Sequence, residues 1–104
     1  MSDEDSKTRA KGGRMAVESD PETATGVYSN LMLVSHRKEE FVLDFLFVEP
    51  QAVAGGQKAR LRARAITSPE HAKRIIRALQ ENVNRYEKRF GPIEEATDMP
   101  RALH

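Results

Sequence analysis

The stretch Phe41–Pro50, with the sequence FVLDFLFVEP, decides the fold of this chain. Seven of its first eight residues are strongly apolar, and the run is too short for a typical helix before it ends at a proline. Phenylalanine and β-branched valine fit a pleated surface, so the stretch predicts a β-strand. Both faces of this strand are apolar except at Asp44, and such a strand needs cover on both sides.

Two further strands are predicted, one on each side of this stretch in the sequence. Val27–His36 (VYSNLMLVSH) predicts the first, and the polar connection Arg37–Glu40 has a length that suits an antiparallel hairpin. A loop, Gln51–Gln57, follows the central strand. Lys58–Thr67 (KARLRARAIT) predicts the third strand. It alternates apolar residues on one face with arginines on the other, namely Ala59, Leu61, Ala63 and Ala65 against Arg60, Arg62 and Arg64.

A long helix is predicted after the third strand. Ser68-Pro69-Glu70 is typical of a helix start, since serine caps and proline suits the first turn. The helix should run over Pro69–Phe90 and end at Gly91-Pro92. Its length of about 33 Å allows it to lie across a sheet. Its apolar residues recur at steps of three and four and form one stripe: Ala72, Ile75, Ile76, Leu79, Val83, Tyr86 and Phe90.

The predicted fold class is α+β. A three-stranded antiparallel β-meander is followed by one long C-terminal helix packed on one face, in a single β-β-β-α domain over residues 26–91. Residues 1–25 have few large apolar side chains and predict a disordered N-terminal tail. Residues 92–104 predict a flexible C-terminal tail.

Composition limits the cellular location and the kinds of reactive or metal site that the chain can have. The 104 residues contain no cysteine, which excludes a disulfide, a thiolate zinc site and a cysteine nucleophile. No apolar run reaches the ~18 residues that a membrane span needs. The charged N-terminus lacks the apolar core of a signal peptide, so a cytoplasmic location is expected.

Charge is distributed unevenly along the chain. The net charge is only +1, but residues 57–91 carry ten basic and three acidic side chains. Such an excess can attract polyanions. The alternative is that these residues only solvate a strand face and the back of a helix.

Four short motifs mark the predicted domain: Tyr28-x-Asn30, Phe41-x-Leu43-Asp44-Phe45, Ser68-Pro69-Glu70-His71-Ala72-Lys73-Arg74 and Leu79-x-x-Asn82-x-x-x-Tyr86-Glu87-x-x-Phe90-Gly91. In these motifs the chain resembles a set of small bacterial and archaeal proteins classed as a domain of unknown function. The resemblance covers about residues 26–93 and implies no activity. More loosely, a strand meander followed by a long helix is similar to the export chaperone SecB.

Asp44 is the most informative single residue, because it is the one charge within the most apolar strand. If the phenylalanines of that strand pack on the helix, Asp44 shares the outer face with the three arginines. A cross-strand pair between Asp44 and Arg62 is then expected, because it would compensate a partly buried carboxylate. No second acid or nucleophile accompanies Asp44, so the sequence predicts no catalytic site and no enzyme.

Histidine and asparagine residues offer little further chemistry. His36, His71 and His104 form no ligand cluster, so neither a metal nor another cofactor is expected. Tyr28, Asn30 and Asn82 are expected to form a polar contact between the first strand and the helix.

The small core sets the functional expectation. A core of about 65 residues with one helix is marginal alone, and an exposed apolar strand face usually means a partner. We therefore expect a non-catalytic, homo-oligomeric protein-binding or adaptor module, with a SecB-like holdase as one version. The alternative is a nucleic-acid-binding protein that uses the basic strand and helix residues, although no exposed aromatics interleave with them. The candidate interface residues are Val42, Asp44, Leu46, Val48, Arg60, Arg62 and Arg64.

Overall fold

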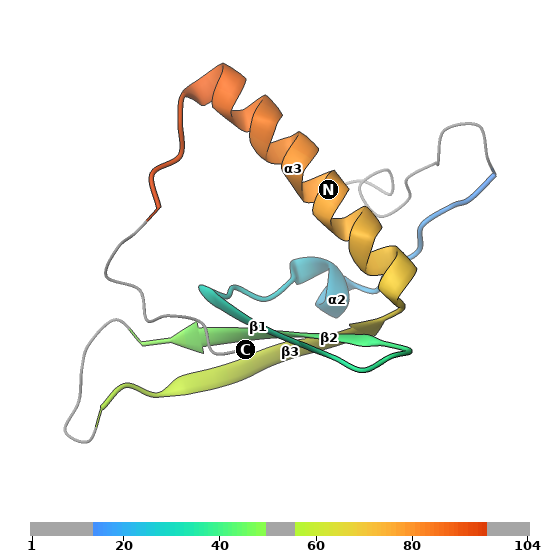
Figure 1. Cartoon of the computed structure of the whole chain (residues 1–104), viewed down its shortest axis with the longest axis vertical. Coiled ribbons are helices and arrows are strands. Elements are labelled where there is room, and N and C mark those ends of the chain that lie inside the picture. Colours follow the sequence, from blue (N-terminus) through green and yellow to red (C-terminus); the bar gives the residue numbers. More distant parts are fainter. Residues whose placement is uncertain (1–13, 50–55, 96–104) are drawn as a thin grey trace.

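The computed structural model describes residues 14–49 and 56–95. The elements follow in the order α2 (Pro21–Thr25), β1 (Leu31–His36), β2 (Phe41–Val48), β3 (Ala59–Thr67) and α3 (Pro69–Phe90). The strands form an open antiparallel sheet in the order β1-β2-β3, with the long helix after it (Figure 1). The α+β meander with a C-terminal helix is therefore confirmed. The predictions for residues 1–13, 50–55 and 96–104 lie outside the described residues.

The strands lie within two residues of the predicted bounds, except at the start of β1. β1 begins at Leu31, later than the predicted Val27. The reason is the side chain of Asn30, which binds the backbone of Val48 in place of a backbone group from a longer β1. Its Nδ2 donates to the Val48 carbonyl at 3.0 Å, and its Oδ1 accepts from the Val48 N–H at 2.8 Å. Both backbone groups of Val48 are thereby satisfied without another residue of β1.

Both ends of α3 lie where the sequence predicts them. At the start, Oγ of Ser68 accepts a hydrogen bond from the His71 N–H at 3.1 Å, and Pro69 occupies the first turn. At the end, Gly91 has a φ of 102°, and its N–H donates to the Glu87 carbonyl at 2.9 Å. This φ lies in a region that glycine adopts without steric cost.

The expected packing of the helix across one sheet face is not found. α3 leaves the end of β3 and extends away from the sheet (Figure 1). The cause is the connection, because Ser68 alone separates β3 from α3. Ser68 is extended, with φ −79° and ψ 158°, and the following proline restricts it to such conformations. The direction of the helix is thus set by the cap and not by contacts with the sheet.

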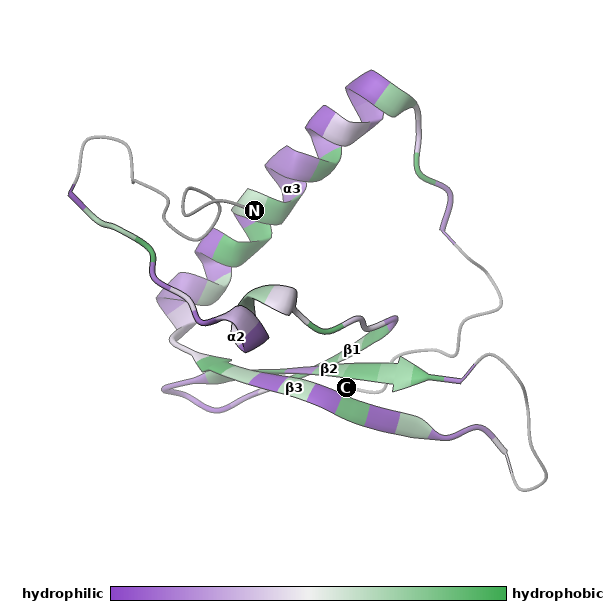
Figure 2. Ribbon diagram, turned by 180° about the vertical axis from the view of Figure 1, so that it is seen from behind, coloured by the Kyte–Doolittle hydropathy of each residue, from purple (hydrophilic) through white to green (hydrophobic). Residues whose placement is uncertain are grey.

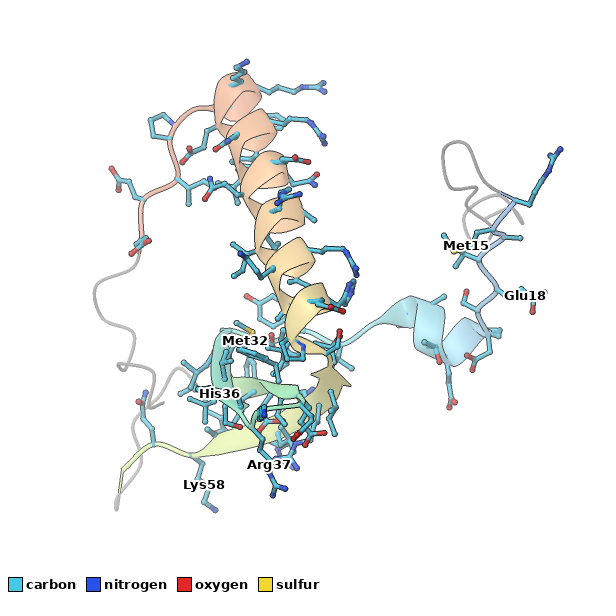
Figure 3. All side chains as sticks on the ribbon, turned by 45° about the vertical axis from the view of Figure 1, so that its right-hand side comes forward. Met15, Glu18, Met32, His36, Arg37 and Lys58 are labelled. Carbon is cyan, nitrogen blue, oxygen red and sulfur yellow. The ribbon has the colours of Figure 1, made fainter. Side chains whose placement is uncertain are left out.

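A short helix lies in the segment for which the sequence predicts no regular structure. Pro21 and Glu22 suit the first turn of α2, and the Thr25 hydroxyl donates to the Pro21 carbonyl at 2.9 Å. All residues of α2 are exposed. Together with the preceding segment that carries Met15 and Glu18, α2 stands away from the sheet and from α3 (Figure 3).

Burial is very limited. Among the described residues, Val48 is the one buried hydrophobic side chain, with 4% of its surface exposed. The other seven residues of β2 are half-buried, and the apolar side chains of α3 are half-buried or exposed. An isolated copy of this fold therefore leaves most of its potential core in contact with water.

Candidate interaction surface

The register of the sheet divides its side chains into two faces. Residues opposite each other in an antiparallel pair point to the same side, so the pairs of β2 with β1 and β3 define both faces. The first, here named the phenylalanine face, comprises Met32, Val34, His36, Phe41, Leu43, Phe45, Phe47, Arg60, Ala63, Ala65 and Thr67. The second, here named the aspartate face, comprises Leu31, Leu33, Ser35, Val42, Asp44, Leu46, Val48, Ala59, Leu61, Arg64 and Ile66.

Asp44 pairs with Arg64, and the predicted pair with Arg62 is wrong. Asp44 lies directly opposite Arg64 in the register. The guanidinium donates two hydrogen bonds, from Nε to Oδ1 at 2.6 Å and from Nη2 to Oδ2 at 3.0 Å. Of the Asp44 side chain, 18% is exposed, against 54% of Arg64. The hydrogen bond from Arg64, with its charge, lowers the pKa of the Asp44 carboxyl.

Arg62 forms a β-bulge, which explains the error. Phe45 pairs with Ala63 and Leu46 pairs with Leu61, so Arg62 has no partner on β2. An extra residue of this kind shifts the alternation of its strand by one position. Arg60 consequently lies on the phenylalanine face, whereas Arg64 lies on the aspartate face. The three arginines do not form the single row that the sequence predicts.

Most of the predicted interface residues still lie together. Val42, Asp44, Leu46, Val48 and Arg64 share the aspartate face, while Arg60 and Arg62 do not join them. The structure adds two apolar residues of β3, Leu61 and Ile66, to the aspartate face. The sequence pattern predicts Leu61 on the opposite face and assigns Ile66 to neither face. Both are well exposed. No signal in the sequence marks this change at the bulge, because polar and apolar residues alternate without a break from Lys58 to Ala65.

The phenylalanine face combines large side chains of β2 with small side chains of β3. Phe45 lies opposite Ala63, and Leu43 lies opposite Ala65. Two further rings border the phenylalanines. The ring of His36 stacks on Phe41 with 5.3 Å between the ring centroids, and the rings of Tyr28 and Phe47 meet edge to face with 6.1 Å between their centroids. Figure 2 shows the end of β2 in the green of hydrophobic residues, whereas green and purple segments alternate along β3. Small residues beside large ones allow another element to approach the sheet closely.

A second apolar surface lies on α3. The helix stripe comprises Ala72, Ile75, Ile76, Leu79, Val83, Tyr86 and Phe90. Ile76 is 67% exposed, Leu79 59% and Phe90 65%, although these residues face one side of the helix. The rings of Tyr86 and Phe90 contact each other at a centroid distance of 4.9 Å. Hydrophobic segments recur along one side of α3 without an element to cover them (Figure 2).

The expected polar contact between the first strand and the helix does not form. Asn30 binds the backbone of Val48, whereas Asn82 donates to the Ala78 carbonyl within α3 at 3.0 Å. Tyr28 is 72% exposed. The three residues lie apart because α3 leaves the sheet. The role of Asn30 in ending β1 was not predicted.

The described residues give little indication of chemistry. Residues 14–49 and 56–95 contain no group of three or more histidine, aspartate or glutamate side chains placed to hold a metal ion. In that same part of the chain, no helix has both the length and the apolar character to cross a membrane. The features that stand out are the two sheet faces and the helix stripe, which are suited to binding apolar surfaces.

A comparison with protein-family models gives a match over most of the chain. The model of a family described as "Protein of unknown function (DUF3467)" matches residues 1–95. No curated protein and no solved structure matches the chain.

Proposed function

The chain belongs to DUF3467, a family of proteins of unknown function, so a function has to be inferred from the geometry of the fold. We propose that the protein is a non-catalytic protein-binding module that works as a homo-oligomer. One observation carries this proposal. The helix stripe and the phenylalanine face are both uncovered, and in the described residues only Val48 is buried as a hydrophobic side chain. Apolar surface of this extent favours association strongly.

A second copy is the simplest partner. A twofold axis brings the same surfaces together in a reciprocal contact, so one set of residues covers both chains. Complete burial of a large aliphatic or aromatic side chain contributes about 1.5–3 kcal/mol, and the stripe offers several such side chains. This gain compensates for a core that is too small in the single chain.

The aspartate face is the proposed surface for other proteins. Its apolar residues Val42, Leu61 and Ile66 surround the Asp44–Arg64 ion pair, so it offers hydrophobic contact together with two charges of fixed position. Mixed surfaces of this kind are typical of non-obligate interfaces. A holdase that binds unfolded segments, of the type that the likeness to SecB suggests, is one form of this function.

Nucleic-acid binding has less support. A row of three arginines on one strand face would suit a phosphate backbone. The bulge at Arg62 separates these arginines, and the carboxylate of Asp44 already engages Arg64. A gel-shift titration at low and moderate salt tests this alternative, since binding through phosphates weakens steeply with salt.

Sedimentation of the full chain tests the proposal directly. At micromolar concentration we expect a species of at least twice the 11.7 kDa of a single chain. Leu79→Gln should shift the chain towards the monomer, because it places an amide in the helix stripe. The matched control is Arg77→Gln, which puts the same side chain on the opposite side of α3 and should leave assembly unchanged. A folded monomer of the parent chain at these concentrations would refute the proposal.

A further inference from the structure

Resting on the proposed homo-oligomer, we infer that two copies exchange their C-terminal helices, so that α3 of each chain lies across the phenylalanine face of the other. The occupant of each apolar surface is then a defined segment of a second copy. The argument has four parts: the connection between β3 and α3, the fit of helix to sheet, the charges, and the failure of other arrangements to cover both surfaces.

The connection makes exchange easier than folding back. Ser68 is the single residue between β3 and α3, and it is held by two hydrogen bonds: the His71 N–H donates to its Oγ, and the Ala72 N–H donates to its carbonyl at 2.9 Å. Pro69 fixes the next φ. To lie flat on its own sheet, α3 would have to tilt about Ser68, the one residue that lies outside both elements. Short connections of this kind promote exchange between copies.

The two surfaces match in size and shape. α3 has 22 residues and is about 33 Å long, and β2 has eight residues and spans about 27 Å. The helix stripe can therefore follow the whole phenylalanine row of a partner. Ala63 and Ala65 border this row and leave space for the helix to approach. The aspartate face is the poorer acceptor, because an ion pair occupies its centre.

The charges of the two surfaces do not oppose this contact. The phenylalanine face carries one permanently charged side chain, Arg60, which lies opposite Phe47 near the end of β2. α3 carries six basic side chains, and all of them lie outside the helix stripe. The stripe can therefore meet the face without burying an unpaired charge, which would be costly.

Other pairings of two copies leave apolar surface exposed. Pairing of two helix stripes covers both helices and leaves both phenylalanine faces open. Pairing of β1 edges extends the sheet and covers neither. Reciprocal exchange covers both surfaces in one closed, twofold contact, so further chains are not recruited.

Isotope-filtered NMR tests the exchange. Labelled and unlabelled chains are mixed, unfolded and refolded together, so that mixed dimers form. We expect intermolecular contacts between the methyl groups of Ile76 and Leu79 in one chain and the ring of Phe45 in the other. If these contacts are found only within one chain, or if α3 contacts only the partner's α3, the exchange is refuted while the homo-oligomer remains. A monomer would refute both.

A lengthened connection provides an independent test. Insertion of Gly-Ser-Gly-Ser-Gly between Thr67 and Ser68 preserves the cap and allows α3 to fold onto its own sheet. We expect sedimentation to show a folded monomer in place of the dimer, because exchange is no longer needed. The control is the same insertion after Gly91, beyond the helix, which should leave the dimer intact. An unchanged dimer in the first variant would refute the exchange.

Discussion

Asp44 shows how one residue connects the sequence to the sheet. It is the one charged residue of β2, and the structure places it opposite Arg64 with two hydrogen bonds. The charge of Asp44 is therefore compatible with a half-buried position, because a fixed cation accompanies it. The need for an arginine partner follows from the sequence, but the choice among three arginines depends on the bulge.

The stability of the fold should depend on pH through Asp44. Arg64 lowers the pKa of this carboxyl in the folded chain, so the unfolded chain binds more protons in the acidic range. The contribution of Asp44 is thus complete above its ordinary pKa and is lost as the pH falls through the lowered value. We expect Asp44→Asn to reduce the free energy of unfolding at neutral pH and to have progressively less effect below about pH 4. Denaturant titrations over this range measure the difference.

The control for this prediction is a double-mutant cycle. Asp20 also has a lowered pKa, chiefly through a hydrogen bond with Thr23, so the parent chain alone does not isolate Asp44. In the background of Arg64→Gln, Asp44→Asn should have little effect on the pH dependence. An equal effect with and without Arg64 would show that another group sets the pKa.

At the scale of elements, the sequence predicts the number, type and order of the main strands and the long helix. The helix ends are fixed by local signals, namely the Ser68 cap and Gly91, and such signals do not depend on the rest of the fold. β1 was predicted too long, because a hydrophobic pattern does not show that the Asn30 side chain, and not a backbone group, pairs with Val48. The bulge was missed because it follows from the joint register of two strands. The split of the predicted arginine row has the same origin.

Deletion of Arg62 tests the bulge. Without this residue, β3 alternates regularly and keeps the same partners on β2, because Arg62 itself has none. We expect the free energy of unfolding to change by less than about 1 kcal/mol. Deletion of Arg64 is the contrasting variant, since it removes the ion pair and turns one part of β3 to the wrong face. We expect it to cost about 2–4 kcal/mol or to prevent folding.

Equal effects of the two deletions would contradict this description of β3. Urea unfolding followed by circular dichroism measures both. The slope of the unfolding curve provides a control, because a similar slope shows that the variants expose a similar area on unfolding.

At the scale of the whole molecule, the sequence predicts that some apolar surface remains uncovered. The structure leaves a larger apolar surface uncovered than the sequence predicts. The sequence pattern predicts one sheet face covered by α3 and one left open. Both are open in the structure, and so is the helix stripe. Periodicity identifies the apolar side of a helix but not the surface that it meets. That depends on the direction in which the chain leaves β3, and Ser68 and Pro69 set this direction.

The effect of Leu79→Ala should depend on protein concentration. Leu79 is 59% exposed in the single chain, so its truncation removes few contacts there and should cost less than about 1 kcal/mol. In an assembly that covers the helix stripe, the same truncation removes a buried side chain and should cost about 2–5 kcal/mol. Unfolding midpoints at concentrations that differ by about a hundredfold separate the two cases, because association stabilises the folded chain by mass action. Arg77→Ala, on the opposite side of α3, should show no such dependence. A cost of Leu79→Ala below about 1 kcal/mol at both concentrations would mean that the stripe is not part of an interface between copies.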